Sequence, residues 1–252
     1  MGAQIFIDVN GDGTITGSVS GSLISGDDPF RVMKRMLADV DYPVIFDVGA
    51  HHGHLTKLFR KLFPTSEVAA FEPCPYAFEE LKAAIAHDER IDAFNFGFAN
   101  RCGELTFHRN QSDSTNSLLA SDEQAAKTWR PGLLDTVQIG SGEFRTLSSF
   151  LDEYEYDYID ILKMDVQGAE HLVLEGLSEP SRVKIIYSEI IMQPTYKGQL
   201  RFDEMLKVFY DKGFDLYNIY NMSFTTDGWL RQVDVIFTRK EISDAGSNTY
   251  RN

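Results

Sequence analysis

The sequence predicts an α/β fold in which helices cover a mostly parallel β-sheet. From residue 44 onward, short apolar runs rich in Val, Ile and Phe alternate with amphipathic patterns of helical period. The chain has 252 residues, 43% hydrophobic and 25% charged, a composition typical of globular domains. These observations predict one main domain with a sizeable buried core.

The expected elements of the first half follow one another in a regular order. Asp28-Pro29 is typical of a helix start, and Phe30, Met33 and Leu37 continue the pattern at helical spacing. Strands are then expected at 44–48, 68–71 and 93–98, with helices at 54–63 and 76–87. After an extended piece at 104–108, residues 110–141 lose periodicity, and we expect a long loop that sets substrate specificity.

Regular patterns return in the second half. Helices are expected at 147–154, 169–176 and 202–212, and strands at 159–164, 183–191, 214–219 and 233–238. We therefore divide the chain into a Gly, Ser and Asp-rich N-terminal extension at 1–28, a main domain at 29–240 and a flexible tail at 241–252.

The N-terminal extension contains a run that matches the first half of a calcium-binding loop. The run begins at Asp8 and has Val19 where such a loop needs an acidic twelfth residue. Because no flanking helical pattern accompanies the run, we interpret it as a turn in a hairpin that begins near Ile5.

The chain is strongly acidic. Its net charge of −14 repels nucleic acid and anionic membrane surfaces, so neither is an expected partner. No apolar run is long enough to span a bilayer, and no secretory signal pattern opens the chain, so we expect a cytoplasmic protein. Cys74 and Cys102 lack disulfide or metal-site spacing and are expected to be reduced thiols. The sequence leaves the oligomeric state open.

The strongest local motif is Asp47-Val48-Gly49-Ala50-His51-His52-Gly53, where a predicted strand passes into a helix. Glycines allow a backbone to approach a ligand closely, and a helix N-terminus offers free N–H groups and the positive end of its dipole. A carboxylate or phosphate group suits such a loop. The motif alone does not define a ligand, because many doubly wound sheets have a glycine there for packing.

Glu72 ends the next predicted strand, in Ala70-Phe71-Glu72-Pro73. A carboxylate at this place can accept hydrogen bonds from both hydroxyls of a ribose, so the ligand is predicted to be a nucleoside. A dinucleotide dehydrogenase would have glycine where His51 stands, and no G-x-x-x-x-G-K-S/T run occurs. The remaining common nucleoside ligand of this scaffold is S-adenosylmethionine.

Four motifs resemble those of the FkbM-type methyltransferases. They are Val44-Ile45-Phe46-Asp47-Val48-Gly49-Ala50, Phe71-Glu72-Pro73, Asn95-Phe96-Gly97-Phe98 and Ile159-Asp160-Ile161-Leu162-Lys163-Met164-Asp165-Val166-Gln167-Gly168-Ala169-Glu170. The resemblance extends from about Tyr42 to Phe237. It implies a Rossmann-like, seven-stranded methyltransferase sheet, mostly parallel with an antiparallel last strand, with helices on both faces. It also implies methyl transfer from S-adenosylmethionine, usually to a hydroxyl.

The same resemblance implies the cofactor contacts. It places Asp47, Gly49 and Gly53 around the methionine part, Glu72 at the ribose, and Asn95, Gly97 and Phe98 near the adenine. Ala50 and Pro73 complete the expected cofactor set, together with Asn116 and Ser117 from a weaker Asn-Ser-Leu motif and with Asp165 at the sulfonium. One departure is Gln167, where the family block usually has glutamate, so a carboxylate role there is lost.

Methyl transfer to oxygen requires an in-line approach to the sulfonium and removal of a proton from the acceptor. The candidate bases are Asp165, Glu189 and His51. Glu189 has an equally good structural explanation as a strand-end residue, and Glu170 is better explained as a first-turn residue that complements the helix dipole.

Two further groups of side chains are of types that bind metals or ligands. His51, His52 and His54 crowd the first loop, but consecutive histidines rarely converge on one ion, so no metal is expected. Trp229 and Tyr196 are the aromatic residues expected to contact an acceptor, because sugars and polyketides stack on exposed rings.

The sequence favours an O-methyltransferase that acts on a small hydroxylated molecule, such as a saccharide or a polyketide-like secondary metabolite. Two alternatives remain open. One is N-methylation of an amine or peptide, which the same cofactor site permits and the acidic charge suits. The other is a non-catalytic module that senses S-adenosylmethionine and regulates a partner.

Overall fold

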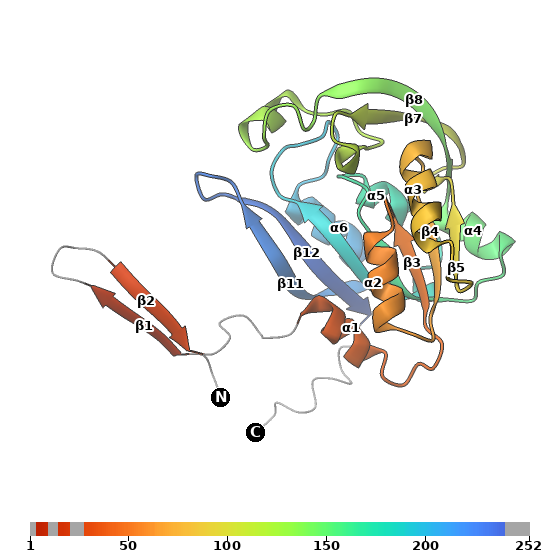
Figure 1. Cartoon of the computed structure of the whole chain (residues 1–252), viewed down its shortest axis with the longest axis horizontal. Helices are drawn as coiled ribbons and strands as arrows, with labels where there is room; N and C mark the ends of the chain where they lie inside the picture. Colours follow the sequence, from red (N-terminus) through yellow and green to blue (C-terminus); the bar gives the residue numbers. More distant parts are fainter. Residues whose placement is uncertain (1–3, 10–14, 21–27, 240–252) are drawn as a thin grey trace.

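A sheet of seven strands forms the centre of the computed structural model, which describes residues 4–9, 15–20 and 28–239 (Figure 1). The strand order is β11-β12-β10-β9-β3-β4-β5. The bounds are β3 (Val44–Val48), β4 (Glu67–Phe71), β5 (Ile91–Phe94), β9 (Ile159–Met164), β10 (Val183–Ile191), β11 (Phe214–Phe224) and β12 (Leu230–Arg239). Strands β5, β4, β3, β9 and β10 are parallel, whereas β12 is antiparallel to both β10 and β11. The predicted fold class is thereby confirmed.

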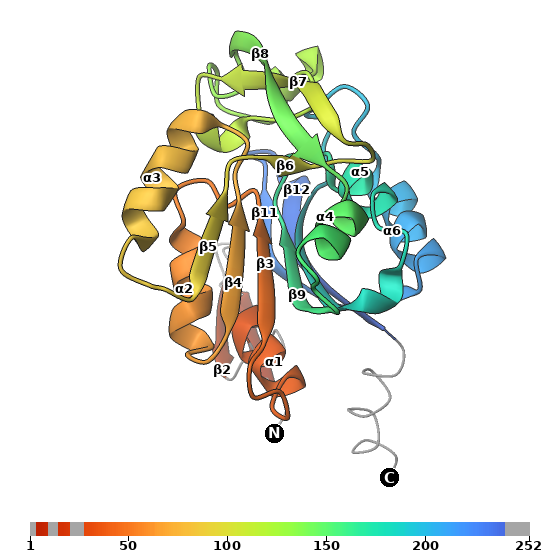
Figure 2. The ribbon, with the colours of Figure 1, turned by 90° about the vertical axis from the view of Figure 1, so that its right-hand side faces the viewer.

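Helices cover both faces of this sheet (Figure 2). One face carries α1 (Pro29–Met36), α2 (His54–Leu62) and α3 (Pro75–Ile85), and the other carries α4 (Leu147–Glu153), α5 (Glu170–Glu175) and α6 (Phe202–Asp211). Each layer of helices closes a separate hydrophobic core against the sheet. On β3, Phe46 and Val48 join one core while Ile45 joins the other, as the two-residue period of a strand requires.

Local signals in the sequence explain where helices begin. The Asp28 carboxylate accepts a hydrogen bond from the Phe30 N–H at 2.8 Å, and Pro29 fits the first helical position of α1. Thr146 caps α4 in the same way, because its hydroxyl accepts from the Ser149 N–H at 3.1 Å. The amphipathic patterns of the sequence therefore become helices at close to their predicted bounds.

A second, three-stranded sheet stands beyond the carboxyl ends of the central strands (Figure 2). It contains β6 (Gly97–Phe98), β8 (Thr136–Arg145) and β7 (Gly103–Asn110), in that order. The expected strand at 93–98 is wrong, because β5 ends at Phe94 and β6 pairs with β8 instead. The expected loop at 110–141 is also wrong at its end, since β8 begins at Thr136. Most of β8 is exposed, so it lacks the buried and exposed alternation that predicts strands.

The remaining elements are short. Between β7 and β8 lie the 3-10 helices η1 (Asp113–Thr115) and η2 (Glu123–Lys127), and η3 (Pro180–Arg182) precedes β10. In the extension, β1 (Gln4–Val9) pairs antiparallel with β2 (Ile15–Ser20), whereas the expected turn at 10–14 and the tail at 241–252 lie outside the described residues. Within the described part of the chain, no helix has the length and apolar character to cross a membrane.

Candidate active site

A cavity lies where the central strands β3, β4 and β9 end and the second sheet begins. Because β3 is hydrogen-bonded to both β4 and β9, the segments that follow these three strands converge on one edge of the sheet. The cavity is lined by Val48, Gly49, His51, Glu72, Pro73, Gly97, Phe98, Phe107, Asp113, Ser114, Asn116, Ser117, Leu118, Phe144, Asp165, Val166, Gln167 and Ala169. This is the edge at which open α/β sheets bind ligands.

Gly49 allows two strand ends to approach each other closely. Its φ is +74°, and a Cβ placed there would lie 2.0 Å from the Asp165 carbonyl oxygen. The N–H groups of Gly49 and Ala50 both donate to the Phe71 carbonyl at 3.0 Å, which fixes the loop against the end of β4. Only glycine can adopt this left-handed conformation and also leave room for the Asp165 carbonyl.

Lys163 and Asp47 support this loop from beneath. The buried Lys163 ammonium lies 2.8 Å from Oδ1 of Asp47 and donates to the Gly49 carbonyl at 2.7 Å, while Thr56 donates to Oδ2 of Asp47 at 2.6 Å. Burial alone would lower the pKa of Lys163, but the Asp47 and Asp165 carboxylates raise it above its ordinary value. Asp47 is fully buried and does not line the cavity, and its expected contact with the methionine part stays a prediction.

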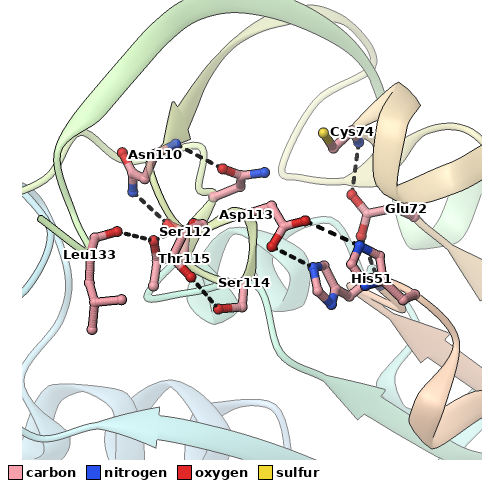
Figure 3. Close-up of polar contacts among 11 residues, drawn as sticks. His51, Glu72, Cys74, Asn110, Ser112, Asp113, Ser114, Thr115 and Leu133 are labelled. Atoms are coloured by element: carbon pink, nitrogen blue, oxygen red, sulfur yellow. Dashed lines mark hydrogen bonds and ion pairs between the residues drawn. The ribbon is translucent and has the colours of Figure 1, made fainter. Parts of the chain in front are cut away.

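Glu72 presents a buried carboxylate to the cavity. Its Oε2 accepts from the His51 N–H at 2.9 Å and its Oε1 from the Cys74 N–H at 2.8 Å (Figure 3). Burial raises the pKa of Glu72 to about 7, although both N–H groups oppose that effect. Asn95 does not line the cavity, but its side chain donates to the Glu72 carbonyl at 2.8 Å and so helps to fix this residue.

The second sheet supplies an apolar wall. Phe98, Phe107 and Phe144 line the cavity together with Leu118. Gly97 packs against Phe144 so closely that a Cβ there would lie 2.4 Å from the ring. A flat aromatic group of a ligand suits such a wall.

Asn116 and Ser117 also line the cavity, and their side chains hold the segment after β7. The Asn110 N–H donates to Oδ1 of Asn116 at 2.8 Å, and the Ser117 hydroxyl donates to the Gln167 carbonyl at 2.8 Å. These contacts join the second sheet to the loop that follows β9.

His51 and Asp113 lie together at one side of the cavity (Figure 3), and His52 also contacts Asp113. Nε2 of each histidine lies 3.1 Å from a different oxygen of Asp113, and the two imidazole rings stack with centroids 3.7 Å apart. The ligand atoms of the three residues lie within 4.8 Å of one another, so the predicted absence of a metal stays a prediction. Burial lowers the pKa of His51, and Asp113 offsets part of this effect.

A second cavity adjoins the first and shares Asp165 with it. It is lined by Phe30, Leu55, Lys163, Met164, Asp165, Tyr187, Glu189, Asn221 and Asp234. Burial, reinforced by the Asp165 charge, raises the pKa of Glu189 well above its ordinary value. Asp234 accepts from the Tyr187 hydroxyl at 2.6 Å and from the Asn221 amide at 2.7 Å.

The structure brings together most of the residues predicted from sequence. Those that line the first cavity are Gly49, His51, Glu72, Pro73, Gly97, Phe98, Asn116, Ser117 and Asp165, whereas Asp47, Ala50, Gly53, Asn95 and Glu189 do not. Gly53 instead caps α2. Tyr196 is buried, so it offers no open ring for stacking, and Trp229 is exposed but lines neither cavity.

Sequence reasoning missed Asp113, Lys163 and the contacts of Gln167. Asp113 stands in an aperiodic polar segment that gives no signal of its position. Lys163 did give a signal, because a lysine inside an otherwise apolar strand needs a buried partner.

The strand order, the glycine loop after the first central strand and the acidic residue after its neighbour are those of a Rossmann-like fold with a ligand site at this edge of the sheet. The chain belongs to the FkbM methyltransferase family, since the family model "Methyltransferase FkbM domain" matches residues 47–216. It is therefore an S-adenosylmethionine-dependent methyltransferase, as the sequence motifs predicted.

Two named relatives are similar to this chain over more than half of its length. The 2-O-methyltransferase NoeI of Sinorhizobium fredii is 28% identical over 166 residues, which cover 63% of this chain and 67% of that one. Methyltransferase sdnD of Sordaria araneosa is 26% identical over 195 residues, covering 69% and 74%. Among solved structures, precorrin-6y C5,15-methyltransferase from Geobacter metallireducens has 10% identity and a TM-score of 0.46, covering 87% of this chain and 92% of that chain.

Proposed function

We propose that the protein transfers the methyl group of S-adenosylmethionine to a hydroxyl of a small molecule, such as a sugar or a secondary metabolite. The observation that carries this proposal is the position of Asp165, which lines both cavities. A carboxylate between a cofactor cavity and a second cavity can accept a hydrogen bond from an acceptor hydroxyl where transfer takes place. The name of NoeI as a 2-O-methyltransferase supports a hydroxyl acceptor.

The residues of the first cavity fit the cofactor. Each oxygen of the Glu72 carboxylate accepts one backbone N–H and keeps a second lone pair, which suits two ribose hydroxyls. The apolar wall of Phe98 and Phe144 suits the adenine, and the loop at Gly49 suits the methionine part. This arrangement supports our inference that the sulfonium lies near Asp165.

The bound cofactor supplies an electrophilic methyl carbon: a C–O bond forms as the C–S bond breaks, and the bond pair stays on sulfur. The acceptor hydroxyl must lose its proton to a base. Oδ2 of Asp165 has no hydrogen-bond partner among the described residues and is available for this proton. His51 is a second candidate, because its lowered pKa keeps the imidazole neutral at pH 7 and its Nε2 is held by Asp113.

One observation favours nitrogen transfer as the second candidate function. The second cavity is lined by the carboxylates of Asp165, Glu189 and Asp234, whereas its one ammonium, on Lys163, is already paired with Asp47. A cavity of negative character attracts a cationic amine. An amine must lose a proton before it attacks the methyl carbon, so the same bases serve both reactions.

A methylation assay separates these functions. The purified protein is incubated with isotopically labelled S-adenosylmethionine and a panel of matched hydroxylated and amine compounds, and mass spectrometry locates the methyl group. We expect methylation on oxygen, and we expect Asp165→Asn to lower kcat by roughly a hundredfold. The exposed Asp39→Asn serves as the control. If only nitrogen were methylated, N-methylation would replace O-methylation as the proposed function. If Asp165→Asn had an unchanged rate, Asp165 would have no part in the mechanism.

A further inference from the structure

Gln167 occupies the turn between β9 and α5 and lines the first cavity. Its φ is +54°, a conformation that residues other than glycine rarely adopt. Its Nε2 donates to Oδ1 of Asp165 at 2.7 Å and to Oε1 of Glu189 at 3.2 Å, and its Oε1 accepts from the Tyr196 hydroxyl at 3.0 Å. One neutral amide therefore bridges two carboxylates.

We infer that Gln167 is a positioning residue for methyl transfer, whose amide holds the Asp165 and Glu189 carboxylates in a fixed relation and leaves Oδ2 of Asp165 for the acceptor. The inference deepens the proposed function and rests on it. Gln167 itself does not contact the reacting atoms, because its side chain acts through Asp165.

The backbone around Gln167 is fixed on both sides of the residue. Oε1 of Glu170 accepts from the Val166 N–H at 3.2 Å and from the Gly168 N–H at 3.3 Å, and the Ser117 hydroxyl donates to the Gln167 carbonyl at 2.8 Å. These contacts stabilise the unusual backbone conformation, so the amide has little freedom to turn away.

The two carboxylates that the amide bridges are not equivalent. Both oxygens of Glu189 are occupied, because Gln232 donates to Oε2 at 2.5 Å while Gln167 donates to Oε1. Asp165 has a partner for Oδ1 alone. Among the described contacts, Asp165 is thus the member of the pair that keeps an oxygen available to a ligand.

A neutral donor suits this place because the surroundings are already crowded with acids. Asp165 and Glu189 interact with each other and with the charged and titratable groups of Glu170, Asp234, Lys163, His51, Tyr187 and Tyr196. The hydrogen bond from the amide stabilises the ionised form of Glu189. A glutamate at 167 would remove this donor and add one more negative charge, so it would disfavour ionisation of Glu189.

The direct test is a carboxyl titration that needs no acceptor. Side-chain carboxyl 13C resonances are followed against pH in the wild type and in Gln167→Glu and Gln167→Met, with Glu189 assigned by its loss in Glu189→Gln. Gln167→Met removes the donors without adding charge, and the exposed Gln124→Glu is the matched control. We expect Gln167→Glu to move the Glu189 midpoint upward by about one pH unit or more, Gln167→Met to move it less, and the control to leave it in place.

Steady-state kinetics of methyl transfer to an acceptor that the methylation assay identifies tests the positioning role of Gln167. We expect kcat to fall roughly tenfold or more in both variants, and we expect the acidic limb of the pH profile of Gln167→Glu to move to higher pH. Wild-type values of kcat and an unchanged pH profile in both variants would overturn the inference, as would an unmoved Glu189 titration. A moved titration in a protein that methylates no acceptor would support the bridge while contradicting the proposed function.

Discussion

Lys163 on β9 and Asp47 on β3 form a buried ion pair across two adjacent parallel strands, with 2.8 Å between Nζ and Oδ1. Neither side chain is more than 4% exposed. The Lys163 ammonium also donates a hydrogen bond to the carbonyl of Gly49, which is the first residue of the glycine loop. The pair therefore connects the centre of the sheet directly to the first cavity, which Gly49 lines.

Replacing Lys163 by methionine should destabilise the fold strongly. The change keeps most of the side-chain volume but leaves the Asp47 carboxylate buried without its cation, which costs about 3–5 kcal/mol. Chemical denaturation at neutral pH measures the loss. Lys57→Met, on the exposed side of α2, is the control and should change the free energy of unfolding by less than about 0.5 kcal/mol. A Lys163→Met variant as stable as the wild type would show that the pair does not support the sheet.

Gly49→Ala should abolish cofactor binding. The new methyl group would meet the Asp165 carbonyl at 2.0 Å in a loop whose φ is +74°, so the strand ends must separate. Gly228→Ala is a matched control, because its φ of +87° carries the same backbone strain while nothing lies within 4 Å of the new Cβ. We expect the control to lose about 1 kcal/mol of stability and to keep its affinity for S-adenosylmethionine in calorimetry. Equal behaviour of the two variants would exclude the close approach as the cause.

The sequence predicted those parts of the fold that depend on local pattern. All of β9 is buried, and its continuous apolar run marked it as a central strand despite Asp160 and Lys163. The glycine loop and Glu72 were found because their position relative to strand ends carries the information. Such features can be predicted without knowing which distant segments of the chain lie together in the fold.

The rest of the site depends on contacts between segments that are distant in sequence. Asp113 belongs to a polar segment between β7 and β8 and reaches His51 through the geometry of the second sheet. Nothing in the spacing of Gln167 and Glu189 indicates that β9 and β10 bring them within hydrogen-bond distance. Strand β8 was missed for a related reason, because its exposed residues are not selected for alternation.

Cofactor affinity should decrease as pH falls through about 7. Burial raises the pKa of Glu72 to about 7, and ribose hydroxyls donate best to the ionised carboxylate, so protonation at lower pH weakens binding. Glu72→Gln should bind roughly tenfold more weakly at pH 8 and lose this pH dependence. Glu67→Gln, exposed at the start of the same strand, is the control. Calorimetric titrations with S-adenosylmethionine from pH 5.5 to 8.5 measure this affinity. If the affinity of Glu72→Gln still depended on pH, the titrating group would be one other than Glu72.

Glu170 should make the fold less stable as pH rises from about 4.5 to about 7. Its carboxyl group is buried, and burial raises its pKa from 4.5 to about 7. In this interval the folded protein holds a proton that the unfolded chain has released, so stability is lost as pH increases. Glu170→Gln keeps an oxygen that can accept from the Val166 and Gly168 N–H groups but cannot ionise. We therefore expect the variant to be more stable than the wild type by about 3 kcal/mol at pH 8 and nearly equal to it at pH 4.5. Denaturant unfolding at both pH values measures the difference, and a constant difference between the two proteins would mean that Glu170 titrates normally.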